Sequence, residues 1–477
     1  METRSTKMST LAKKRAIDFT NGPILKNILI FIWPLLVHHF LQTIFNSVGM
    51  MVVSKFSPNG AIAMGAMSAS GPMLAFLMNI ISGVSAATGI LVALRIGAHD
   101  EKEVERIIHS SAVFSFIGGT VLMVIGIATI KPFLTLTSVP DSMMSEATAY
   151  MVAYYMGFPI MMVLNSMSAS LRASGDTYHT MIFMSIAGAA SLLSTTILVF
   201  GFGLGAVSSG VGVTVMQIVG GSLIIRHMMK LDGMCRFSFK RLRLAKDVIK
   251  GILITGVPIG LQNGITPIAN MFVQSCVNTF GDVVITGAAA ADTFPSYIGS
   301  ITNALAVALL TIVSQNIGAK KYDRVKKMVI IIVLSVVVIG LLMGLACYIF
   351  REPLLGLYIS DDDALDPALV MEAAELKLLI YCVPYFLYGV VECLSNSLNG
   401  MKKTGISVTV SMICLCGVRV VWTTVATALF PESVGAIYLS SPVSWFITVV
   451  VDAIILVAAF KKFSKNKPCS NEVIAEN

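Results

Sequence analysis

Long apolar stretches, separated by short polar segments, follow one another along almost the whole chain. Each holds at least about 20 residues with few or no charges, which is the length that crosses a bilayer as a helix. Because lipid offers no hydrogen-bond partner to the backbone, uninterrupted segments of this length are expected to be α-helices. Twelve spans are predicted in this way, at residues 27–54, 61–94, 107–130, 147–171, 177–200, 204–225, 251–281, 283–313, 328–350, 378–401, 404–431 and 433–460.

The composition supports the same fold class. Hydrophobic residues make up 56% of the 477 residues and charged residues only 13%, which leaves too little polar surface for a soluble protein of this size. The sequence therefore predicts an all-α polytopic membrane protein that is surrounded by the lipid bilayer. No cysteine has the spacing to histidine that is typical of a metal site, so no resident metal or cofactor is expected.

The net charge of +8 raises the question of nucleic-acid binding, so the positions of the cations matter. If the N-terminus is cytoplasmic and the spans alternate, most of the 34 Lys and Arg residues fall on the cytoplasmic side. Lys55, Lys131, Arg351 and Lys377 fall on the outer side, and Arg419 falls within a span. This bias follows the positive-inside rule. It predicts that both termini are cytoplasmic, and no nucleic-acid partner is expected.

The chain also contains an internal repeat. The segment "RIGAHDEKEVERI" (95–107) corresponds to "NIGAKKYDRVKKM" (316–328), and "LRASGDT" (171–177) corresponds to "LNGMKKT" (398–404). Each half holds six spans, so both halves should enter the membrane in the same orientation and form two pseudo-symmetric lobes around a central cavity. This arrangement favours a transporter, although duplication also arises in large membrane bundles without a transport role.

The repeat sets the predicted domain boundaries. A cytoplasmic tail at residues 1–26 precedes an N-lobe of six spans at 27–230. A basic cytoplasmic linker at 231–250 leads to a C-lobe of six spans at 251–462, and a second cytoplasmic tail at 463–477 completes the chain.

Several segments carry a family resemblance. The segment "VSQNIGAKKYDRVKK" after the eighth span resembles the Gln-Asn-x-Gly-Ala-Lys pattern of the bacterial multidrug and toxic compound extrusion (MATE) family. The segments "QTIFN" in the first span, "LRASGDT" after the fourth and "GLGA" before the sixth are similar to further marks of that family. The resemblance implies twelve helices in two lobes of six. It also implies alternating access and the export of organic cations in exchange for Na⁺ or H⁺.

Ionisable residues other than His and Tyr are rare within the predicted spans. Only Asp292, Glu392, Arg419 and Asp452 are found there, and all four belong to the second half. Charges in hydrocarbon cost roughly 2.5 to 3.5 kcal/mol on insertion scales, so they usually face an interior and have a role. The resemblance implies acids in the first and fifth spans of some family members, but this chain has Gly49 at the first position and no acid in the fifth span.

Polar residues recur at helical spacing in three spans, so each set lies on one helix face. We interpret these stripes as the walls of a wet cavity that binds ions and substrate, although helix–helix hydrogen bonding is an open alternative. In the tenth span, the family's usual aspartate position is occupied by Tyr388, and Glu392 lies one turn further along. The three stripes are His38, Gln42 and Asn46; Gln262, Thr266 and Asn270; and Tyr388, Glu392 and Asn396.

Glu392 is the first candidate for ion coupling, and Na⁺ near Glu392 is the only metal ion considered. Asp292 is a second candidate that would bind a cation or a proton. The alternative for Asp292 is a structural acid paired with a neighbouring Tyr or Asn. Arg419 and Asp452 lie in adjacent spans, where a charge pair would lower the cost of both.

The sequence therefore predicts a monomeric secondary active transporter of a bacterial inner membrane. It would export amphipathic or cationic small molecules by H⁺ or Na⁺ antiport. A flippase for a lipid-linked precursor is an alternative, but its pyrophosphate group would need buried bases, and Arg419 is the only candidate. A non-transport intramembrane protein is a further alternative. No zinc-binding His-Glu-x-x-His segment and no phosphate-binding Gly-rich loop support an enzyme.

Overall fold

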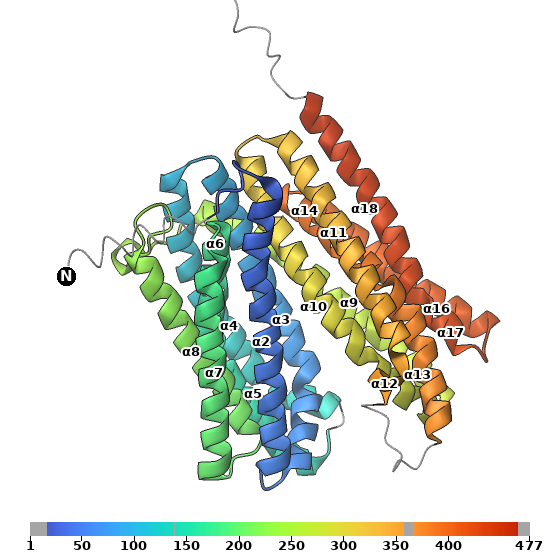
Figure 1. Cartoon of the computed structure of the whole chain (residues 1–477). Helices are drawn as coiled ribbons and strands as arrows, with labels where there is room; N and C mark the ends of the chain where they lie inside the picture. The colour runs from blue at the N-terminus through green and yellow to red at the C-terminus, as the bar shows by residue number, and fades with distance from the viewer. Residues whose placement is uncertain (1–16, 138, 357–365, 466–477) are drawn as a thin grey trace, which may run out of the picture. The chain divides into compact units, whose positions relative to one another are not determined.

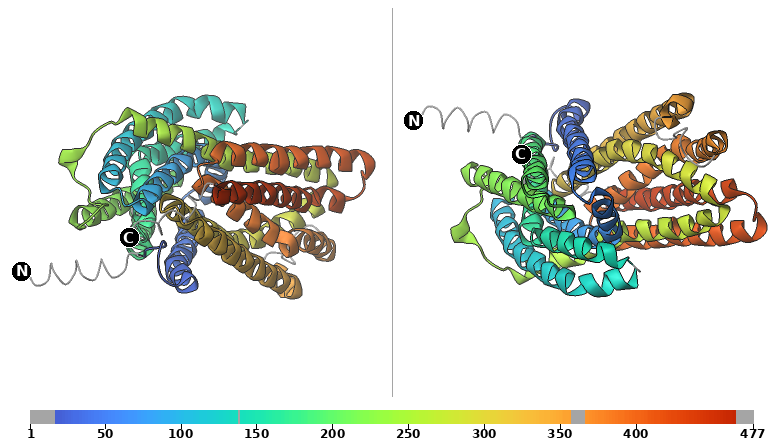
Figure 2. Two further views of the ribbon diagram at one scale, coloured as in Figure 1. Left: turned by 90° about the horizontal axis from the view of Figure 1, so that it is seen from above. Right: turned by 90° about the horizontal axis from the view of Figure 1, so that it is seen from below.

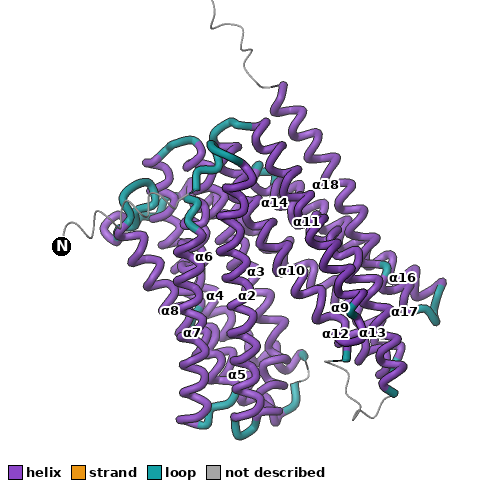
Figure 3. Tube along the Cα trace, in the orientation of Figure 1, coloured by secondary structure: helices purple, strands orange, loops and turns teal. Residues whose placement is uncertain are grey.

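The computed structural model describes residues 17–137, 139–356 and 366–465 (Figure 1). Helices account for nearly all of this part of the chain, and it contains no β-strand (Figure 3). The predicted all-α class is therefore confirmed. Residues 1–16 of the predicted N-terminal tail and residues 466–477 of the predicted C-terminal tail lie outside the described residues.

The chain divides into two compact units, Met1–Pro267 and Ile268–Asn477. The division falls within one long helix, α9 (Lys246–Val277), which comes after the short 3₁₀ turn η1 (Phe239–Arg241). The other helices of the first unit are α2 (Ile24–Phe56), α3 (Gly60–Gly97), α4 (Glu101–Leu136), α5 (Asp141–Tyr155), α6 (Phe158–Ala173), α7 (Thr177–Phe202) and α8 (Ala206–Lys230). Figure 2 gives two further views, in which the connection from α8 to α9 is light green.

The second unit continues from the end of α9 with helices joined by short turns. Its elements are η2 (Asn278–Phe280), α10 (Asp282–Gly318), α11 (Tyr322–Ile349), α12 (Arg351–Leu355), α13 (Pro367–Cys382), η3 (Val383–Tyr385), α14 (Phe386–Gly400), α15 (Thr404–Val410), η4 (Ser411–Gly417), α16 (Val418–Leu429), α17 (Val434–Tyr438) and α18 (Ser440–Lys465). The η4 segment is a π-helix that joins α15 to α16, so this span runs from Thr404 to Leu429.

Within the described residues, 11 helices are long and apolar enough to cross a membrane, and the number rises to 12 if one bent pair is a single span. That pair is α5 and α6, which meet at 46°. The bend lies at Met156 and Gly157, and Pro159 is the second residue of α6, where its ring suits the first turn of a new helix. With this pair counted once, the prediction of twelve spans agrees with the structure.

The tenth span begins earlier than the sequence predicted. It runs from Pro367 to Gly400, and the predicted start at 378 is wrong because the charges of Glu375 and Lys377 interrupt the apolar pattern before that residue. Both charges have partners in the structure. Glu375 lies 3.1 Å from Arg351 Nε, and Lys377 pairs with Asp292. Lys377, which the sequence pattern places on the outer side, therefore lies within the helix that forms the tenth span.

Glycines allow α3 and α9 to pack closely within the first unit. A methyl group added at Gly83 would lie 2.3 Å from the carbonyl oxygen of Gly256 and 2.7 Å from the Cα atom of Gly260. No larger side chain fits between these backbones. Small residues at such crossings are typical of membrane helices, because apolar association in lipid depends on close packing.

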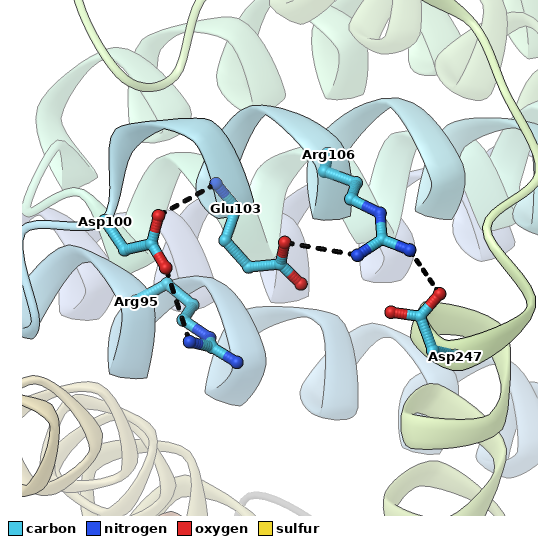
Figure 4. Close-up of polar contacts among 5 residues, drawn as sticks. All are labelled: Arg95, Asp100, Glu103, Arg106 and Asp247. Atoms are coloured by element: carbon cyan, nitrogen blue, oxygen red, sulfur yellow. Dashed lines mark hydrogen bonds and ion pairs between the residues drawn. The ribbon is translucent and has the colours of Figure 1, made fainter.

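The repeated segment "RIGAHDEKEVERI" forms the connection from α3 to α4 (Figure 4). Asp100 caps α4 by accepting a hydrogen bond from the backbone N–H of Glu103 at 3.2 Å, and it lies 3.4 Å from Arg95. Arg106 contacts Glu103 at 3.4 Å and also pairs with Asp247 in the first turn of α9. These contacts attach the start of α9 to α4.

Candidate transport sites

A cavity of about 260 Å³ lies within the first unit. Four helices provide most of its wall, namely α2, α5, α7 and α8, and Met67 of α3 contributes as well. The predicted stripe of α2 lines this cavity, since His38, Gln42 and Asn46 all face it. The structure thus places these three side chains along one wall, as their spacing of four residues requires.

The opposite walls are aromatic and hydroxylated. Tyr150 and Tyr154 of α5 contribute rings, and Ser185, Ser191 and Thr195 of α7 contribute hydroxyl groups. None of the described residues that line the cavity carries a carboxylate. A volume near the lower end of known ligand pockets suits a small amphipathic molecule or one part of a larger one.

A close contact between α2 and α7 shapes this cavity. A methyl group added at Gly188 would lie 2.4 Å from Cδ2 of the Phe45 ring, and both residues line the cavity. The absence of a side chain at Gly188 therefore makes room for the ring of Phe45. Gly49 also lines the cavity, but a methyl group there would meet no atom within 4 Å.

The predicted stripe of the seventh span lies on α9, across the division between the units. Gln262 and Thr266 are half-buried in the first unit, and neither lines the cavity of that unit. Asn270 lies in the second unit, where its side-chain oxygen accepts a hydrogen bond from Arg419 Nη1. The structure thus connects the Asn270 position of this stripe to Arg419.

Glu392 lies on α14 within the second unit and has two unequal carboxyl oxygens. Its Oε1 accepts a hydrogen bond from the side-chain amide of Asn303 on α10 at 3.2 Å. Its Oε2 is buried and has no hydrogen-bond partner among the described residues. Tyr388 and Asn396 share this helix face and are half-buried, whereas the intervening Cys393 is fully buried.

An aromatic cluster covers this part of the second unit. The ring of Trp445 on α18 lies 5.5 Å from that of Tyr385, 5.7 Å from that of Tyr388 and 5.8 Å from that of Tyr381. Among these rings, only that of Tyr388 was predicted to belong to a site. The spacing of Tyr381, Tyr385 and Tyr388 at i, i+4 and i+7 is the signal that would have found the other two.

Asp292 forms an ion pair that was not predicted from the sequence. The Nζ atom of Lys377 on α13 lies 2.7 Å from each carboxylate oxygen of Asp292 on α10. This Nζ atom also donates to the backbone oxygen of Ala288 at 3.3 Å and lies 5.6 Å and 5.4 Å from the ring centres of Tyr381 and Tyr438. The partner of Asp292 is thus a lysine, and not the Tyr or Asn that was considered.

The predicted charge pair between Arg419 and Asp452 is wrong. Both side chains are buried, but no ion pair joins them within the part of the chain that the structure describes. Asp452 faces α14, where its Oδ2 accepts from the Ser395 hydroxyl at 3.1 Å. Arg419 faces α9 and donates to Asn270. The two side chains point to different neighbouring helices, so adjacency of their spans did not bring them together.

A family model described as MatE matches residues 34–197 and 258–425. The chain belongs to this family of membrane transporters. Two matches of one model, one in each half of the chain, agree with the internal repeat in the sequence. Members of the MatE family are transporters of small molecules and not enzymes, so the expectation of a multidrug efflux transporter is confirmed at the level of the family.

The curated relatives match most of the chain. The chain is 23% identical over 405 residues to the probable multidrug resistance protein YoeA of Bacillus subtilis, covering 83% of this chain and 85% of that protein. It is 23% identical over 384 residues to the FAD transporter of Shewanella oneidensis, and the match covers 77% of this chain and 82% of that protein. It is 19% identical to the multidrug export protein MepA of Staphylococcus aureus, and the match covers 78% of this chain and 82% of that protein.

Solved structures of MatE proteins share the fold. The chain matches the outward-facing conformation of a multidrug resistance MATE family transporter with a TM-score of 0.86 at 16% identity, covering 94% of this chain and 99% of that one. It matches the Vibrio cholerae MATE transporter VcmN in its bent form with a TM-score of 0.82 at 18% identity, covering 93% and 98%. At these identities the likeness establishes the fold of a MatE transporter.

Proposed function

We propose that the protein is a secondary active exporter that moves amphipathic, cationic small molecules out of a bacterial cell in exchange for H⁺ or Na⁺. It works by alternating access as a monomer in the inner membrane, with both termini in the cytoplasm. The observation that carries this proposal is the free oxygen of Glu392. This Oε2 atom is buried and has no hydrogen-bond partner among the described residues, whereas Oε1 is held by Asn303.

A carboxyl group in this position has two stable states. With a proton, it gains an O–H donor and loses its charge, and with a Na⁺ ion, its charge is compensated. A buried carboxylate with neither is costly in a membrane. Glu392 therefore gains stability from either coupling ion, and Asn303 holds its other oxygen in place. No comparable acid is found among the described residues that line the cavity of the first unit.

The cavity of the first unit is the proposed place for the cargo. Tyr150, Tyr154 and Phe45 offer aromatic faces that attract organic cations. Met50, Met67 and the other methionines of the wall adapt to cargo of different shapes, because their side chains are unbranched and flexible. The polar atoms of His38, Gln42 and Asn46 provide hydrogen bonds on one side of the cavity.

Asp292 has a smaller part in this proposal than Glu392. Its charge is compensated by Lys377, whose Nζ atom contacts both of its oxygens. An acid that already has a cation as partner gains little from binding another. The ion pair thus supports the structural alternative for Asp292, and Glu392 is the proposed coupling residue.

A second candidate function is the export of an anionic cargo. The described part of the cavity wall lacks carboxylates, so it does not repel an anion, and the side chain of His38 is available as a donor. One of the relatives is named for transport of FAD, which carries a pyrophosphate group. The lipid-linked precursor of the flippase alternative has the same chemistry.

The experiment uses the full chain reconstituted in liposomes with an imposed pH gradient or an imposed Na⁺ gradient. A fluorescent organic cation and a flavin nucleotide are offered as separate cargoes. We expect the cation to move against its gradient when one of the two ion gradients is present. Movement of the flavin nucleotide alone would favour the second candidate. If neither ion gradient drives either cargo, ion-coupled export is refuted.

A further inference from the structure

Three potential metal ligands meet where α7 begins and α8 ends, outside the cavity of the first unit. Asp176 is the N-cap residue of α7, His179 lies in the first turn of α7, and His227 lies in the last turn of α8. One ligand atom from each residue lies within 4.8 Å of the other two. Asp176 belongs to the "LRASGDT" segment, which the proposed transport mechanism does not use.

We propose that Asp176, His179 and His227 form a binding site for a divalent transition metal ion of the Zn²⁺ class. The two imidazoles and one carboxylate are a ligand set that Zn²⁺ favours, with a fourth position left for water or a thiolate. The ion would connect the start of α7 to the end of α8.

The carboxylate of Asp176 has contacts beyond its helix cap. Its Oδ1 accepts the capping hydrogen bond from the backbone N–H of His179 at 3.1 Å and also lies 3.0 Å from His179 Nδ1. Its Oδ2 lies 2.7 Å from His179 Nδ1 and 3.5 Å from His227 Nε2. A helix cap needs only one oxygen and a backbone N–H, so capping does not explain why two histidine rings contact this carboxylate.

The Nε2 atom of His227 faces the Asp176 carboxylate, whose Oδ2 lies 3.5 Å away. This atom is buried, and no hydrogen bond of good geometry satisfies it among the described residues. A buried nitrogen of this kind is usually satisfied by a protein group, a water molecule or an ion. The ring of His227 stacks on that of His179 with centres 4.3 Å apart and planes at 29°, which brings both imidazoles to the carboxylate.

One of the distances between ligand atoms already matches a tetrahedral ion. With metal–ligand bonds of about 2.0 to 2.1 Å, ligand atoms around tetrahedral Zn²⁺ lie about 3.4 Å apart. The distance of 3.5 Å from His227 Nε2 to Asp176 Oδ2 is close to this value. His179 Nδ1 is closer because it hydrogen-bonds the carboxylate, and the ion would replace that hydrogen bond.

Cys235 is a candidate for the fourth ligand. It is buried in the connection after α8 and is close enough to Asp176 to be affected by its charge. A thiol that coordinates a metal ion loses its proton.

The chain around the site determines what the ion would hold together. Gly175 adopts a φ of +89°, and a methyl group added there would lie 2.3 Å from the backbone oxygen of Ile17. The hydroxyl of Thr177 donates to the backbone oxygen of Phe31 on α2 at 3.0 Å. An ion at Asp176 would therefore stabilise the attachment of α2, which carries His38, Gln42 and Asn46.

The test measures Zn²⁺ binding to the full chain, purified without a polyhistidine tag and freed of metal with a chelator. We expect one tight site per chain by calorimetric titration. The His227→Asn and Asp176→Asn variants should each lose about 100-fold or more in affinity. His99→Asn is the matched control, because His99 is exposed and its left-handed backbone, with φ 57°, tolerates Asn. This control should bind as the unmodified chain does.

Co²⁺ serves as a spectroscopic probe of the same site. Visible bands of tetrahedral Co²⁺ in the unmodified chain, lost in His227→Asn, would support the proposal. A thiolate charge-transfer band that disappears in Cys235→Ser would identify Cys235 as the fourth ligand, and its absence would assign water to that position.

Thermal unfolding of each variant without metal shows whether that variant is folded. Zn²⁺ should raise the Tm of the unmodified chain and leave the Tm of His227→Asn or His179→Asn unchanged. If the folded variants bind Zn²⁺ as tightly as the unmodified chain, or if the unmodified chain binds none, the site does not exist.

Discussion

Lys377 Nζ lies 2.7 Å from both carboxylate oxygens of Asp292, and the two side chains differ in exposure. The side chain of Lys377 is 5% exposed, whereas that of Asp292 is 50% exposed. The lysine is thus the member of the pair that cannot be solvated when the contact is broken. The acid within the eighth span therefore compensates a buried base in the tenth.

Replacing Asp292 with Asn should destabilise the protein through Lys377. The variant leaves an ammonium group buried without its counter-ion, and we expect a loss of about 1 to 3 kcal/mol, since the half-exposed acid moderates the effect. The double variant Asp292→Asn/Lys377→Met should lose less than the sum of the two single variants. Thermal unfolding in detergent measures all three. Equal transport by the double variant and the unmodified chain would confirm that the pair is structural.

Glu392→Gln should uncouple transport from the ion gradient. The amide keeps the size of the side chain and can still accept from Asn303, but it cannot be ionised. We expect ion-driven uptake in liposomes to fall by about 100-fold or more, while binding of the fluorescent cargo persists. Glu372→Gln is the control, because Glu372 is an exposed acid on α13. Unchanged uptake by Glu392→Gln would assign coupling to another residue.

Gly188→Ala should narrow the cavity of the first unit. The new methyl group would displace the Phe45 ring, whose Cδ2 atom lies 2.4 Å from its position, and the ring would move into the cavity. We expect a higher KM for bulky cargo and a smaller change for compact cargo. Gly49→Ala is the matched control in the same cavity, since its methyl group meets no atom within 4 Å. Similar effects of both substitutions would show that Phe45 is not involved.

Asn270→Leu should leave a buried arginine without its acceptor. Arg419 is 2% exposed and its Nε atom already lacks a hydrogen-bond partner among the described residues. Losing the remaining contact at Nη1 should cost about 1.5 to 3 kcal/mol, as for other hydrogen bonds to charged groups. Gln274→Leu, one turn further along α9, serves as the control. If the Asn270→Leu variant is as stable as the Gln274→Leu control, Arg419 has found another acceptor.

Arg106→Gln should have a small effect on stability. Arg106 contacts Glu103 and Asp247, but its side chain is 34% exposed and that of Asp247 is 60% exposed. Exposed ion pairs contribute about 1 kcal/mol or less, and salt screens them. We expect the difference in Tm to the unmodified chain to shrink further at high salt. A large, salt-independent loss would mean that the attachment of α9 to α4 depends on this arginine.

Much of the fold can be predicted from the sequence, because membrane helices are recognised by the length and apolar composition of their segments. The spans were located within a few residues, except where charged residues lie inside a helix. Lys377 shows the reason. A hydropathy pattern places a lysine outside the membrane, and only the distant Asp292 makes its burial possible. Contacts between residues 85 positions apart are not visible in a local pattern.

The candidate sites could be predicted only in part. Periodicity placed His38, Gln42 and Asn46 on one face, and the structure puts them on one cavity wall. The partners of Asp452 and Arg419 could not be derived, because the rotation of each helix about its axis decides them. The cluster of Asp176, His179 and His227 was missed as well, since His227 is far from the other two in sequence.

The π-helix η4 has a consequence for how its span tolerates change. A π-turn holds one residue more than the α-turn it replaces, so Ser411–Gly417 contains a surplus position. Deleting one residue there should leave the rotation of α16 about the helix axis, relative to α15, unchanged. The same deletion in α15 would swing the guanidinium of Arg419 by about 100° around the helix axis, away from its amide acceptor. This membrane segment therefore has one place along its length where the gene can lose a codon without rotating the remainder of the helix.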